Sequence, residues 1–461
     1  MARPHHPRRR RGGRQARTHR PRRWCRPGEH GDGAAEGARR GLTPGGPARP
    51  RVGSVTREHP EASRARAWLL VAPAVIVLCW GGNQFLPLLQ LYRQQSGYSQ
   101  VQVDILLAVY VIGIVPGFAL SGAWSDRYGR KPVLLVGVAL GIVGSIILAS
   151  SASSLAGLCA GRFVCGLSVA AGMVVGTSWI KELSVRGGRA EAGARRASAV
   201  LTIGFGGGAG VGGALAQFAP LPSVLPYVVQ IAASLAALVA LLRAVETRKA
   251  GVRMPGVRQP SLVGDLRIPK RARARFVGVV LPLAPWVFAA PALAFAVGPS
   301  LVGGAVPGFA VGFATLVTVI TLSFGWLTQF VSGPILRALR GRAGLVGVLF
   351  IAAGALLLIP ASLSQQVWAV LLAAPVFGIG YGLSMVSGLT AVQAMATPDD
   401  LAGLTAVYYS LTYAGFLLPA ILAALTAVTP MGALLVAVAG AMAVCALIAA
   451  RGIRRHGVAA A

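Results

Sequence analysis

Apolar runs of about 20 residues recur along this chain and limit the folds that it can adopt. A run of that length, formed into an α-helix, crosses the ~30 Å hydrocarbon core of a bilayer. In lipid each backbone N–H and C=O group must be bonded within its own segment, which favours helices, and the sequence lacks the ~10-residue alternating strands of a β-barrel. We therefore expect an all-α integral membrane protein with about twelve transmembrane helices. The runs lie at residues 67–90, 104–124, 132–151, 155–180, 198–219, 223–244, 276–298, 308–333, 344–363, 366–392, 402–427 and 431–450.

A polar gap separates the first six runs from the last six. CGLS at 165–168 in the fourth run is similar to YGLS at 381–384 in the tenth. This weak repeat and the helix count indicate two six-helix pseudo-repeat halves, an architecture typical of secondary transporters whose binding site lies near the midplane between the halves. The predicted domains are a basic tail at 1–66, a first half at 67–248, a linker loop at 249–275, and a second half with a short basic tail at 276–461.

The net charge of +31 comes from 44 Lys and Arg against 13 Asp and Glu, and its placement argues against a nucleic-acid partner. Basic residues crowd one alternate set of loops, whereas the other set contains only Arg93. Since short loops rich in Lys and Arg stay in the cytoplasm, we expect both termini and the linker to be cytoplasmic, in a cell or inner membrane. Besides the linker, the basic segments are DRYGRK at 126–131, KELSVRGGRAEAGARR at 181–196, RALRGR at 337–342 and RGIRRH at 451–456.

The tail at residues 1–66 is rich in Arg, Gly and Pro and shows no apolar periodicity, so it cannot bury enough surface to fold. It also lacks the apolar stretch of a signal peptide. Three interpretations stay open: a disordered cytoplasmic segment that aids orientation, a segment that binds anionic lipid or RNA, and translated sequence upstream of the true start. Loss of function on deletion of residues 1–50 would exclude the last of these.

The segment between the second and third runs reads GAWSDRYGRK, from Gly122 to Lys131. It resembles the signature that the major facilitator superfamily carries at this loop, G-x-L-a-D-r-x-G-r-k, with Trp124 in place of Leu. The matching residues are Gly122, Asp126, Arg127, Gly129, Arg130 and Lys131. The resemblance implies that this cluster latches one conformation of an alternating-access cycle. The alternative is an ordinary basic loop that only sets orientation.

The chemistry of this loop agrees with a latch. Gly122 and Gly129 permit a tight reversal between two helices. Asp126 can meet the positive N-terminal end of a neighbouring helix. Arg130 can pair with an acid near the end of the fourth run, where Glu182 is available.

An arginine lies inside the fourth run, in the segment GRFVCGLS at 161–168. The segment resembles the R-x-x-q-G element of the same family through Arg162 and Gly166, with Cys165 in place of Gln. An Arg at membrane depth is costly and marks a functional site by default. The resemblance implies that Arg162 takes part in proton transfer or substrate binding. The alternative is a side chain that snorkels to the nearer membrane surface.

The fifth run contains GFGGGAGVGG at 204–213. It resembles the family's antiporter signature, g-x-x-x-G-P-x-x-G-G, with Ala209 in place of Pro, and this signature is characteristic of drug–proton exporters. Small residues spaced by four lie on one helix face and let a second helix approach closely. Generic glycine packing is the alternative. The residues concerned are Gly204, Gly208, Gly212 and Gly213.

Two groups of residues are candidates for a substrate pocket, because aromatic walls with a few polar groups are typical of small-molecule sites. The amides at the end of the first run are Asn83, Gln84 and Gln90. The aromatic candidates are Trp286, Trp326, Tyr381, Tyr409 and Tyr413. For each aromatic residue alone, packing or a place in the interfacial belt is the competing interpretation.

Proton coupling needs a titratable group that changes its exposure. Asp104, at the outer start of the second run, is the one acid near the membrane that lies away from the cytoplasmic loops. We take Asp104 and Arg162 as the proton-coupling candidates. A helix N-cap is the alternative role for Asp104.

These features favour a secondary active transporter, a proton-coupled exporter of a small lipophilic or drug-like compound. A proton-symport importer or facilitator of a small metabolite is the alternative, and a non-transporting membrane sensor on the same scaffold is the alternative from another class. The sequence has no GxxxxGK[ST] motif for ATP, and its six histidines all lie in the tails. We therefore expect no enzyme activity, cofactor or metal. The expected partners are the substrate, protons and membrane lipids, with a monomer as the family default.

Overall fold

The computed structural model describes residues 66–186, 190–247, 268–397 and 401–456, and every regular element in these ranges is helical. Twelve segments among them are long and apolar enough to cross a membrane, which confirms the predicted all-α fold. The predicted tail, apart from Arg66, and most of the predicted linker lie outside the described residues. The spans are Ala72–Gln95, Gln100–Tyr128, Arg130–Ser150, Leu155–Val185, Ala192–Phe218, Leu225–Leu242, Lys270–Leu301, Ala310–Phe330, Ala343–Ser364, Val367–Met395, Gly403–Leu425 and Met431–Arg455.

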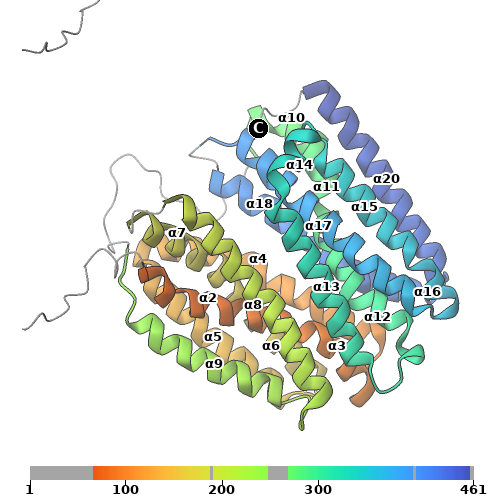
Figure 1. The fold of residues 1–461 in the computed structure, drawn as a ribbon, viewed down its shortest axis with the longest axis horizontal. Helices are drawn as coiled ribbons and strands as arrows, with labels where there is room; N and C mark the ends of the chain where they lie inside the picture. Colours follow the sequence, from red (N-terminus) through yellow and green to blue (C-terminus); the bar gives the residue numbers. More distant parts are fainter. Residues whose placement is uncertain (1–65, 187–189, 248–267, 398–400, 457–461) are drawn as a thin grey trace, which may run out of the picture. The chain divides into compact units, whose positions relative to one another are not determined.

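The two halves each contribute six of these spans, drawn from orange to green and from green to blue in Figure 1. The first half consists of η1 (Ala67–Leu70), α2 (Ala72–Asn83), α3 (Phe85–Gln95), α4 (Gln100–Tyr128), α5 (Arg130–Ser150), α6 (Leu155–Ala171), η2 (Gly172–Gly176), α7 (Thr177–Arg186), α8 (Ala190–Phe218) and α9 (Leu225–Leu242). The second half consists of α10 (Lys270–Arg275), η4 (Phe276–Val280), α11 (Leu281–Ala292), η5 (Leu293–Val297), α12 (Gly298–Leu301), η6 (Gly303–Ala305), α13 (Ala310–Phe330), α14 (Ser332–Ala338), α15 (Ala343–Leu357), α16 (Ile359–Ser364), α17 (Val367–Met395), α18 (Leu401–Tyr413), η7 (Ala414–Leu417), α19 (Leu418–Leu425) and α20 (Met431–His456).

Several spans are interrupted where the sequence predicts a continuous run. The first span breaks between α2 and α3 at Gln84, directly after Gly81, Gly82 and Asn83. Glycine is the weakest helix former after proline, so this segment gives the helix little local support. The fourth and seventh spans pass through π-helical turns, at η2 and at η4 and η5. Wide turns of this kind often occur at functional sites.

The repeat between CGLS and YGLS has a counterpart in the packing of the two halves. Gly166 of α6 packs on α4, where an added Cβ would lie 2.4 Å from the carbonyl oxygen of Tyr110. Gly382 of α17 packs on α13, where an added Cβ would lie 2.6 Å from the carbonyl oxygen of Gly325. Neither position has room for a side chain. The same small residue therefore serves the contact between the second and fourth spans of each half.

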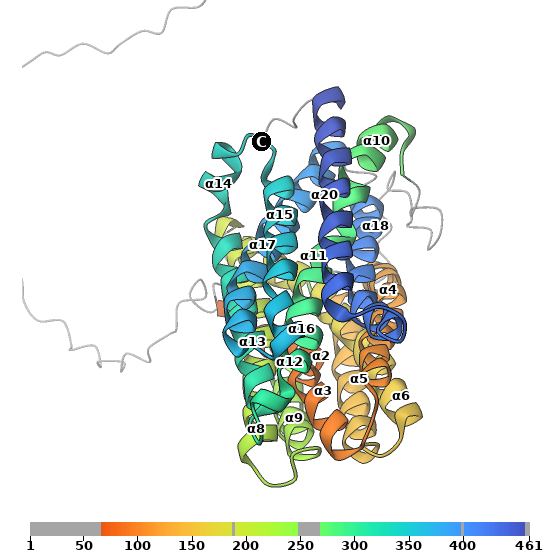
Figure 2. The same ribbon diagram turned by 90° about the vertical axis from the view of Figure 1, so that its right-hand side faces the viewer.

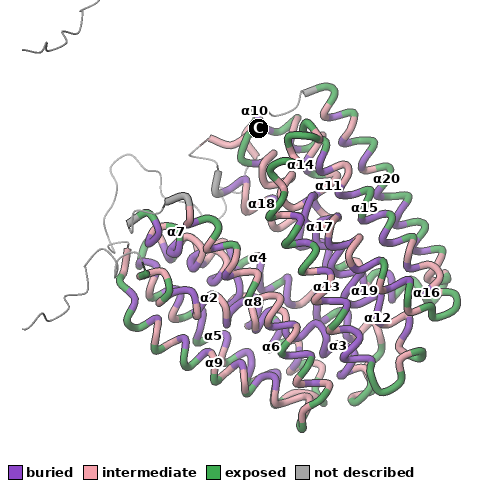
Figure 3. Tube along the Cα trace, in the orientation of Figure 1, coloured by how far each residue is buried: buried purple, intermediate pink, exposed green. Residues whose placement is uncertain are grey.

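The ends of the spans differ in charge. Because consecutive spans alternate in direction, the ends near Arg127, Lys131, Arg271, Arg337 and Arg451 all lie on one side, which we call the basic end. Figure 2 shows α10, α14 and the end of α20 grouped there. Figure 3 shows α2 and α17 buried over much of their length, whereas α9 and α20 carry exposed residues throughout. The exposed residues of the outer helices are largely apolar, as a lipid-facing surface requires.

The halves contact each other at the end opposite the basic end. There the side chain of Gln217 in α8 donates to the carbonyl oxygen of Gly308 at 2.8 Å and accepts from the N–H of Gly312 at 2.7 Å. The rings of Phe218 and Phe309 lie 6.4 Å apart beside these bonds. A single buried cluster also joins apolar residues of α3, α4 and α6 to residues of α11, α13 and α17.

Candidate functional site

A cavity of about 390 Å³ lies between the two halves, and we call it the central cavity. The first half lines it from α2, α4, η2 and α8, and the second half from α11, η5, α13, α17, α18 and η7. None of the described residues that line it is Asp, Glu, His, Lys or Arg. A site of this size, apolar with a few polar groups, suits a small molecule without a fixed requirement for a counter-ion.

Aromatic rings form a continuous wall on the second-half side of the central cavity. Phe288 of α11 stacks on Tyr413 at 4.4 Å and on Phe416 at 5.3 Å between ring centroids. Tyr381 of α17 lies 5.6 Å from the Phe288 ring. Phe118 of α4 reaches Tyr413 at 5.7 Å and so extends the aromatic contacts into the first half. Offset rings at these separations attract each other beyond the effect of area burial, which keeps the wall ordered.

Polar groups lie at separate points of the cavity wall rather than in one cluster. Asn83 belongs to the last turn of α2, just before the break in the first span. Ser198 and Thr202 come from α8, and Gln329 and Gln393 come from α13 and α17. Separate donors and acceptors of this kind orient a ligand that offers a few hydrogen bonds.

Five of the predicted pocket residues line the central cavity: Asn83, Trp326, Tyr381, Tyr409 and Tyr413. The other three do not. Gln84 is fully buried, and its side-chain oxygen accepts the indole N–H of Trp80 at 3.0 Å. Gln90 is 3% exposed among the apolar residues of α3, and Trp286 packs on the buried cluster at the other side of α11. Trp80 and Gln84 are four residues apart and so lie on one helix face, whereas Asn83 lies on the neighbouring face that lines the cavity.

Several lining residues have no signal in the sequence. Phe205, Phe288 and Phe416 line the cavity, as do Met173 and Met385. A phenylalanine in an apolar run does not reveal whether its helix face meets a cavity, lipid or another helix. Some unpredicted lining residues did carry a usable signal, namely Tyr110, Gln329 and Gln393, because a polar group in a membrane helix needs a partner or a wet surface.

Arg162 is fully buried, which excludes the alternative that it snorkels to a membrane surface. Its guanidinium donates from Nη1 to the carbonyl oxygen of Gly82 at 3.2 Å and from Nε to that of Leu106 at 3.4 Å. The rings of Phe85 and Tyr110 lie 4.5 and 4.0 Å from its central carbon. Tyr110 also lines the central cavity, so Arg162 contacts a residue of the cavity wall. Among the described residues, Nη2 has no hydrogen-bond acceptor.

Asp104 is 1% exposed near the start of α4, at the end opposite the basic end. The N-cap of α4 is Ser99, which forms a capping box with Gln102, so the N-cap role considered for Asp104 is wrong. Its carboxylate instead accepts the side-chain amide of Gln100 through both oxygens at 3.0 Å. Asp104 is not among the residues that line the central cavity. A buried carboxylate away from the substrate space remains a candidate for proton binding.

The loop at the basic end contains the predicted ion pair. Nη2 of Arg130 lies 2.8 Å from Oε1 of Glu182, and Nη1 donates to the Ser125 hydroxyl at 2.7 Å. The same Nη1 lies 3.4 Å from a carboxylate oxygen of Asp126. The pairing of Arg130 with Glu182 is therefore confirmed. Whether these residues act as a latch stays a prediction.

The glycines of this loop differ in what they do. Gly129 has φ +101° and forms the whole reversal between α4 and α5. Gly122 lies inside α4, so its predicted part in the reversal is wrong. An added Cβ at Gly122 would meet only Val174, at 3.9 Å. Arg127 stays at the surface, with its guanidinium 5.5 Å from the centre of the Tyr128 ring.

Glu246, which follows α9, contacts this loop, and the sequence gave no reason to single it out. Its carboxylate accepts the backbone N–H of Arg130 at 3.2 Å and that of Lys131 at 2.7 Å. These N–H groups begin α5, and a carboxylate at a helix N-terminus is stabilising. Glu246 follows α9, so it connects the third span to the sixth.

The glycines of α8 pack against the first span, as the spacing predicts. An added Cβ would lie 2.5 Å from Cα of Trp80 at Gly208 and 2.7 Å from Cβ of Gln84 at Gly212. At Gly204 it would lie 2.7 Å from the carbonyl oxygen of Ile76. On a different face, Gly213 meets Thr315 of α13 in the second half. Through these glycines α8 therefore packs on a helix of its own half and on a helix of the second half, close to the cavity.

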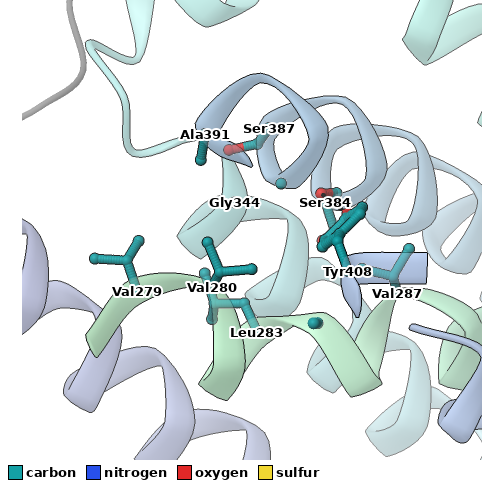
Figure 4. Close-up of a pocket in the computed structure, with 11 residues that line it drawn as sticks. Val279, Val280, Leu283, Val287, Gly344, Ser384, Ser387, Ala391 and Tyr408 are labelled. Carbon is teal, nitrogen blue, oxygen red and sulfur yellow. Dashed lines mark hydrogen bonds between the residues drawn. The ribbon is translucent and has the colours of Figure 1, made fainter. Parts of the chain in front are cut away.

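A second cavity lies within the second half, between α11, α15, α17 and α18 (Figure 4). Ser384 and Tyr408 lie side by side in its wall, and Tyr408 donates to the carbonyl oxygen of Met385 at 3.3 Å. Its volume is only about 30 Å³, the space of one water molecule, so it is too small for a substrate. The described residues include no cluster of His, Cys, Asp and Glu that could hold a metal ion.

Comparison with known proteins gives a consistent family. The sequence model described as Major Facilitator Superfamily matches residues 71–420. The crystal structure of the POT family transporter PepTSo superposes with a TM-score of 0.66 and 12% identity, covering 85% of this chain and 98% of that chain. At that identity the likeness shows the fold alone.

Two curated relatives match shorter stretches. Multidrug resistance protein MdtL of Klebsiella pneumoniae subsp. pneumoniae is 31% identical over 116 residues, which are 25% of this chain and 29% of that protein. Myo-inositol transporter 3A of Cryptococcus neoformans var. grubii is 34% identical over 97 residues, which are 21% of this chain and 16% of that protein. The matched stretches thus span less than a third of either relative.

Proposed function

The chain belongs to the Major Facilitator Superfamily and is a membrane transporter, and we propose that it exports a small lipophilic or drug-like compound by proton-coupled alternating access. The observation that carries this proposal is the central cavity, which both halves line and whose described walls carry no charged side chain. A compound that leaves water for this cavity gains aromatic and apolar contacts but no counter-ion. This favours lipophilic molecules over strongly charged ones.

The placement of contacts between the halves supports alternating access. The halves are bonded at the end opposite the basic end, through Gln217 with Gly308 and Gly312, and they also touch beside the cavity, where Phe118 contacts Tyr413. The cavity reaches Ser198 near the start of α8 and Gln393 near the end of α17, and so extends toward the basic end. With the basic loops in the cytoplasm, this is a conformation that loads its substrate from inside. The ion pair between Arg130 of α5 and Glu182 of α7 would then stabilise one state of the cycle.

Two observations favour export over import. The glycines of α8 match an antiporter signature and contact both halves beside the cavity. The MdtL relative is named as a multidrug resistance protein. For coupling, Asp104 is the one buried acid in the described spans, and Arg162 is the one fully buried arginine there. We assign these two residues to proton coupling.

The proposal is tested with inside-out vesicles from an overexpressing strain, energised to an acid lumen and supplied with a panel of fluorescent lipophilic compounds. We expect accumulation that requires the proton gradient and that falls strongly in Asp126→Asn, whose carboxylate contacts Arg130. Vesicles with the gradient collapsed by an uncoupler provide the control. Absence of accumulation for every compound would contradict export of lipophilic molecules.

Import of a small polyol by proton symport is a second candidate function. It is favoured by the relative named myo-inositol transporter 3A and by the polar groups Asn83, Gln329 and Gln393 in the cavity wall. Right-side-out vesicles with an inward proton gradient distinguish it. Gradient-driven uptake of a radiolabelled polyol, together with no export of lipophilic compounds, would support import.

A further inference from the structure

Two helix ends from opposite ends of the second half meet at the basic end. The seventh span begins with α10, whose sequence from Lys270 to Arg275 is KRARAR, and the twelfth span ends with α20. The seventh span crosses α20 in η4, where an added Cβ at Gly452 would lie 2.3 Å from the carbonyl oxygen of Gly278. Figures 1 and 2 both show α10 beside the end of α20. Residues separated widely in the sequence thus share one surface.

The crossing sets the level of the basic side chains. Arg275 lies three residues before Gly278, and Arg455 lies three residues after Gly452. Because the two spans run in opposite directions, Arg275 and Arg455 come to the same height above the crossing. Arg451 lies one turn nearer the membrane interior on α20. Arg451 and Arg455 are exposed and Arg275 is half-buried.

Few acidic side chains are available to form ion pairs with these basic residues. The only acids after residue 267 are Asp399 and Asp400, which lie outside the described residues. Arg271 is directed to the end of α17, where it donates to the Thr397 hydroxyl at 2.9 Å, and we leave it out of the site. The first half differs, because Arg130 and Lys131 bind Glu182 and Glu246 there. Among the described residues, the surface at α10 and α20 therefore has an excess of positive charge.

An exposed apolar surface continues from this charge toward the middle of the membrane. On α20, Leu447 is 59% exposed and lies four residues before Arg451, on the same helix face. On the seventh span, Val277 and Leu281 are 46% and 38% exposed. These apolar residues are thus exposed on the same two spans that carry the basic residues. A basic rim above an apolar face matches the two parts of a phospholipid, its phosphate and its acyl chains.

We propose that the ends of α10 and α20 form a binding site for an anionic phospholipid. The phosphate lies against Arg275, Arg451 and Arg455, and the acyl chains lie against Val277, Leu281 and Leu447. The site is separate from the central cavity, and it does not depend on the direction of transport or on the substrate.

Native mass spectrometry of the purified full chain in detergent tests the proposal, with phosphatidylglycerol titrated against phosphatidylcholine of the same acyl chains. Each basic residue near a membrane surface is worth about fivefold in affinity. We therefore expect the triple variant Arg275→Gln, Arg451→Gln, Arg455→Gln to bind phosphatidylglycerol on the order of 100-fold more weakly. The matched control is Arg337→Gln, Arg340→Gln, Arg342→Gln, which removes three exposed arginines at the same end, and it should keep the wild-type affinity.

Three outcomes would overturn the proposal: equal affinity in the triple variant and the control, equal affinity for the two lipids, or equally tight binding of soluble glycerol 3-phosphate. The last result would indicate an anion site without lipid docking. If the triple variant does not fold, Arg455→Gln is compared with Arg455→Lys. Loss of binding in the first and retention in the second supports the site, and the same binding in both contradicts it.

Discussion

Glu246 binds the start of α5, where Lys131 lies, and Lys131 binds the end of α9, just before Glu246. The Glu246 carboxylate accepts the N–H of Lys131 at 2.7 Å at the start of α5, while the Lys131 ammonium donates to the carbonyl oxygens of Leu242 at 2.7 Å and Ala244 at 3.1 Å at the end of α9. An anion at a helix N-terminus and a cation at a helix C-terminus both interact favourably with the helix dipole. The pair therefore joins the third and sixth spans of the first half.

The first prediction concerns this reciprocal contact. Glu246→Ala removes the acceptor for two N–H groups, so we expect the free energy of unfolding to fall by about 1–2 kcal/mol. Glu246→Gln keeps one acceptor oxygen and should lose less. Both are measured by titration with SDS in mixed micelles. The control is Lys181→Gln, which changes an exposed lysine of α7. An equal fall in the free energy of unfolding in this control would contradict a specific stabilising role for the Glu246 contacts.

The second prediction uses two neighbouring glycines of α8. A Cβ at Gly208 would lie 2.5 Å from Cα of Trp80, whereas a Cβ at Gly207 meets nothing within 4 Å. Gly208→Ala should lower the free energy of unfolding by about 1–3 kcal/mol, because the backbone of α2 must move. Gly207→Ala should be neutral or stabilising by up to about 1 kcal/mol, since alanine is the better helix former.

The same micelle titration measures both glycine variants. Equal effects of the two substitutions would contradict the close approach of α8 to α2. If Gly208→Ala also lowers transport while Gly207→Ala does not, the close contact between the first and fifth spans is needed for the cycle as well as for the fold.

The third prediction concerns the aromatic wall. Phe288→Ala removes the ring that contacts Tyr413, Phe416 and Tyr381. Phe288 lines the cavity, and a contact between its ring and an aromatic dye adds about 0.5–1.5 kcal/mol beyond area burial. We therefore expect the affinity for the best transported dye to fall about tenfold. Equilibrium binding to the purified protein, followed by fluorescence polarisation, gives the measurement. Phe350→Ala changes a 36% exposed ring on α15 outside the cavity and should leave the affinity unchanged.

The parts of the fold and of the candidate site that could be predicted are those whose residues lie close together in the sequence. The apolar runs and the Arg130 loop are local patterns, and Arg130 and Glu182 are the charges that such a loop offers. Glu246 was missed because it lies 115 residues from Lys131 and resembles any acid that follows a helix. Only a minority of the residues in the cavity wall were predicted, because a residue such as Phe288 in an apolar run gives no sign of the face that it occupies. Gln84 was misplaced because its side chain bonds Trp80, four residues earlier on the same helix face, and does not line the cavity as Asn83 does.

The last prediction concerns the buried acid. Asp104→Asn keeps the shape of the side chain and can still bond the amide of Gln100, so we expect folding to survive. An asparagine cannot bind and release a proton, so gradient-driven accumulation in vesicles should fall to the level reached with an uncoupler. Downhill efflux of preloaded dye, which needs no coupling, should continue in the variant and serves as its internal control. Full gradient-driven accumulation by Asp104→Asn would reject the assignment and leave Arg162, with its unpaired Nη2 beside Tyr110, as the group to test next.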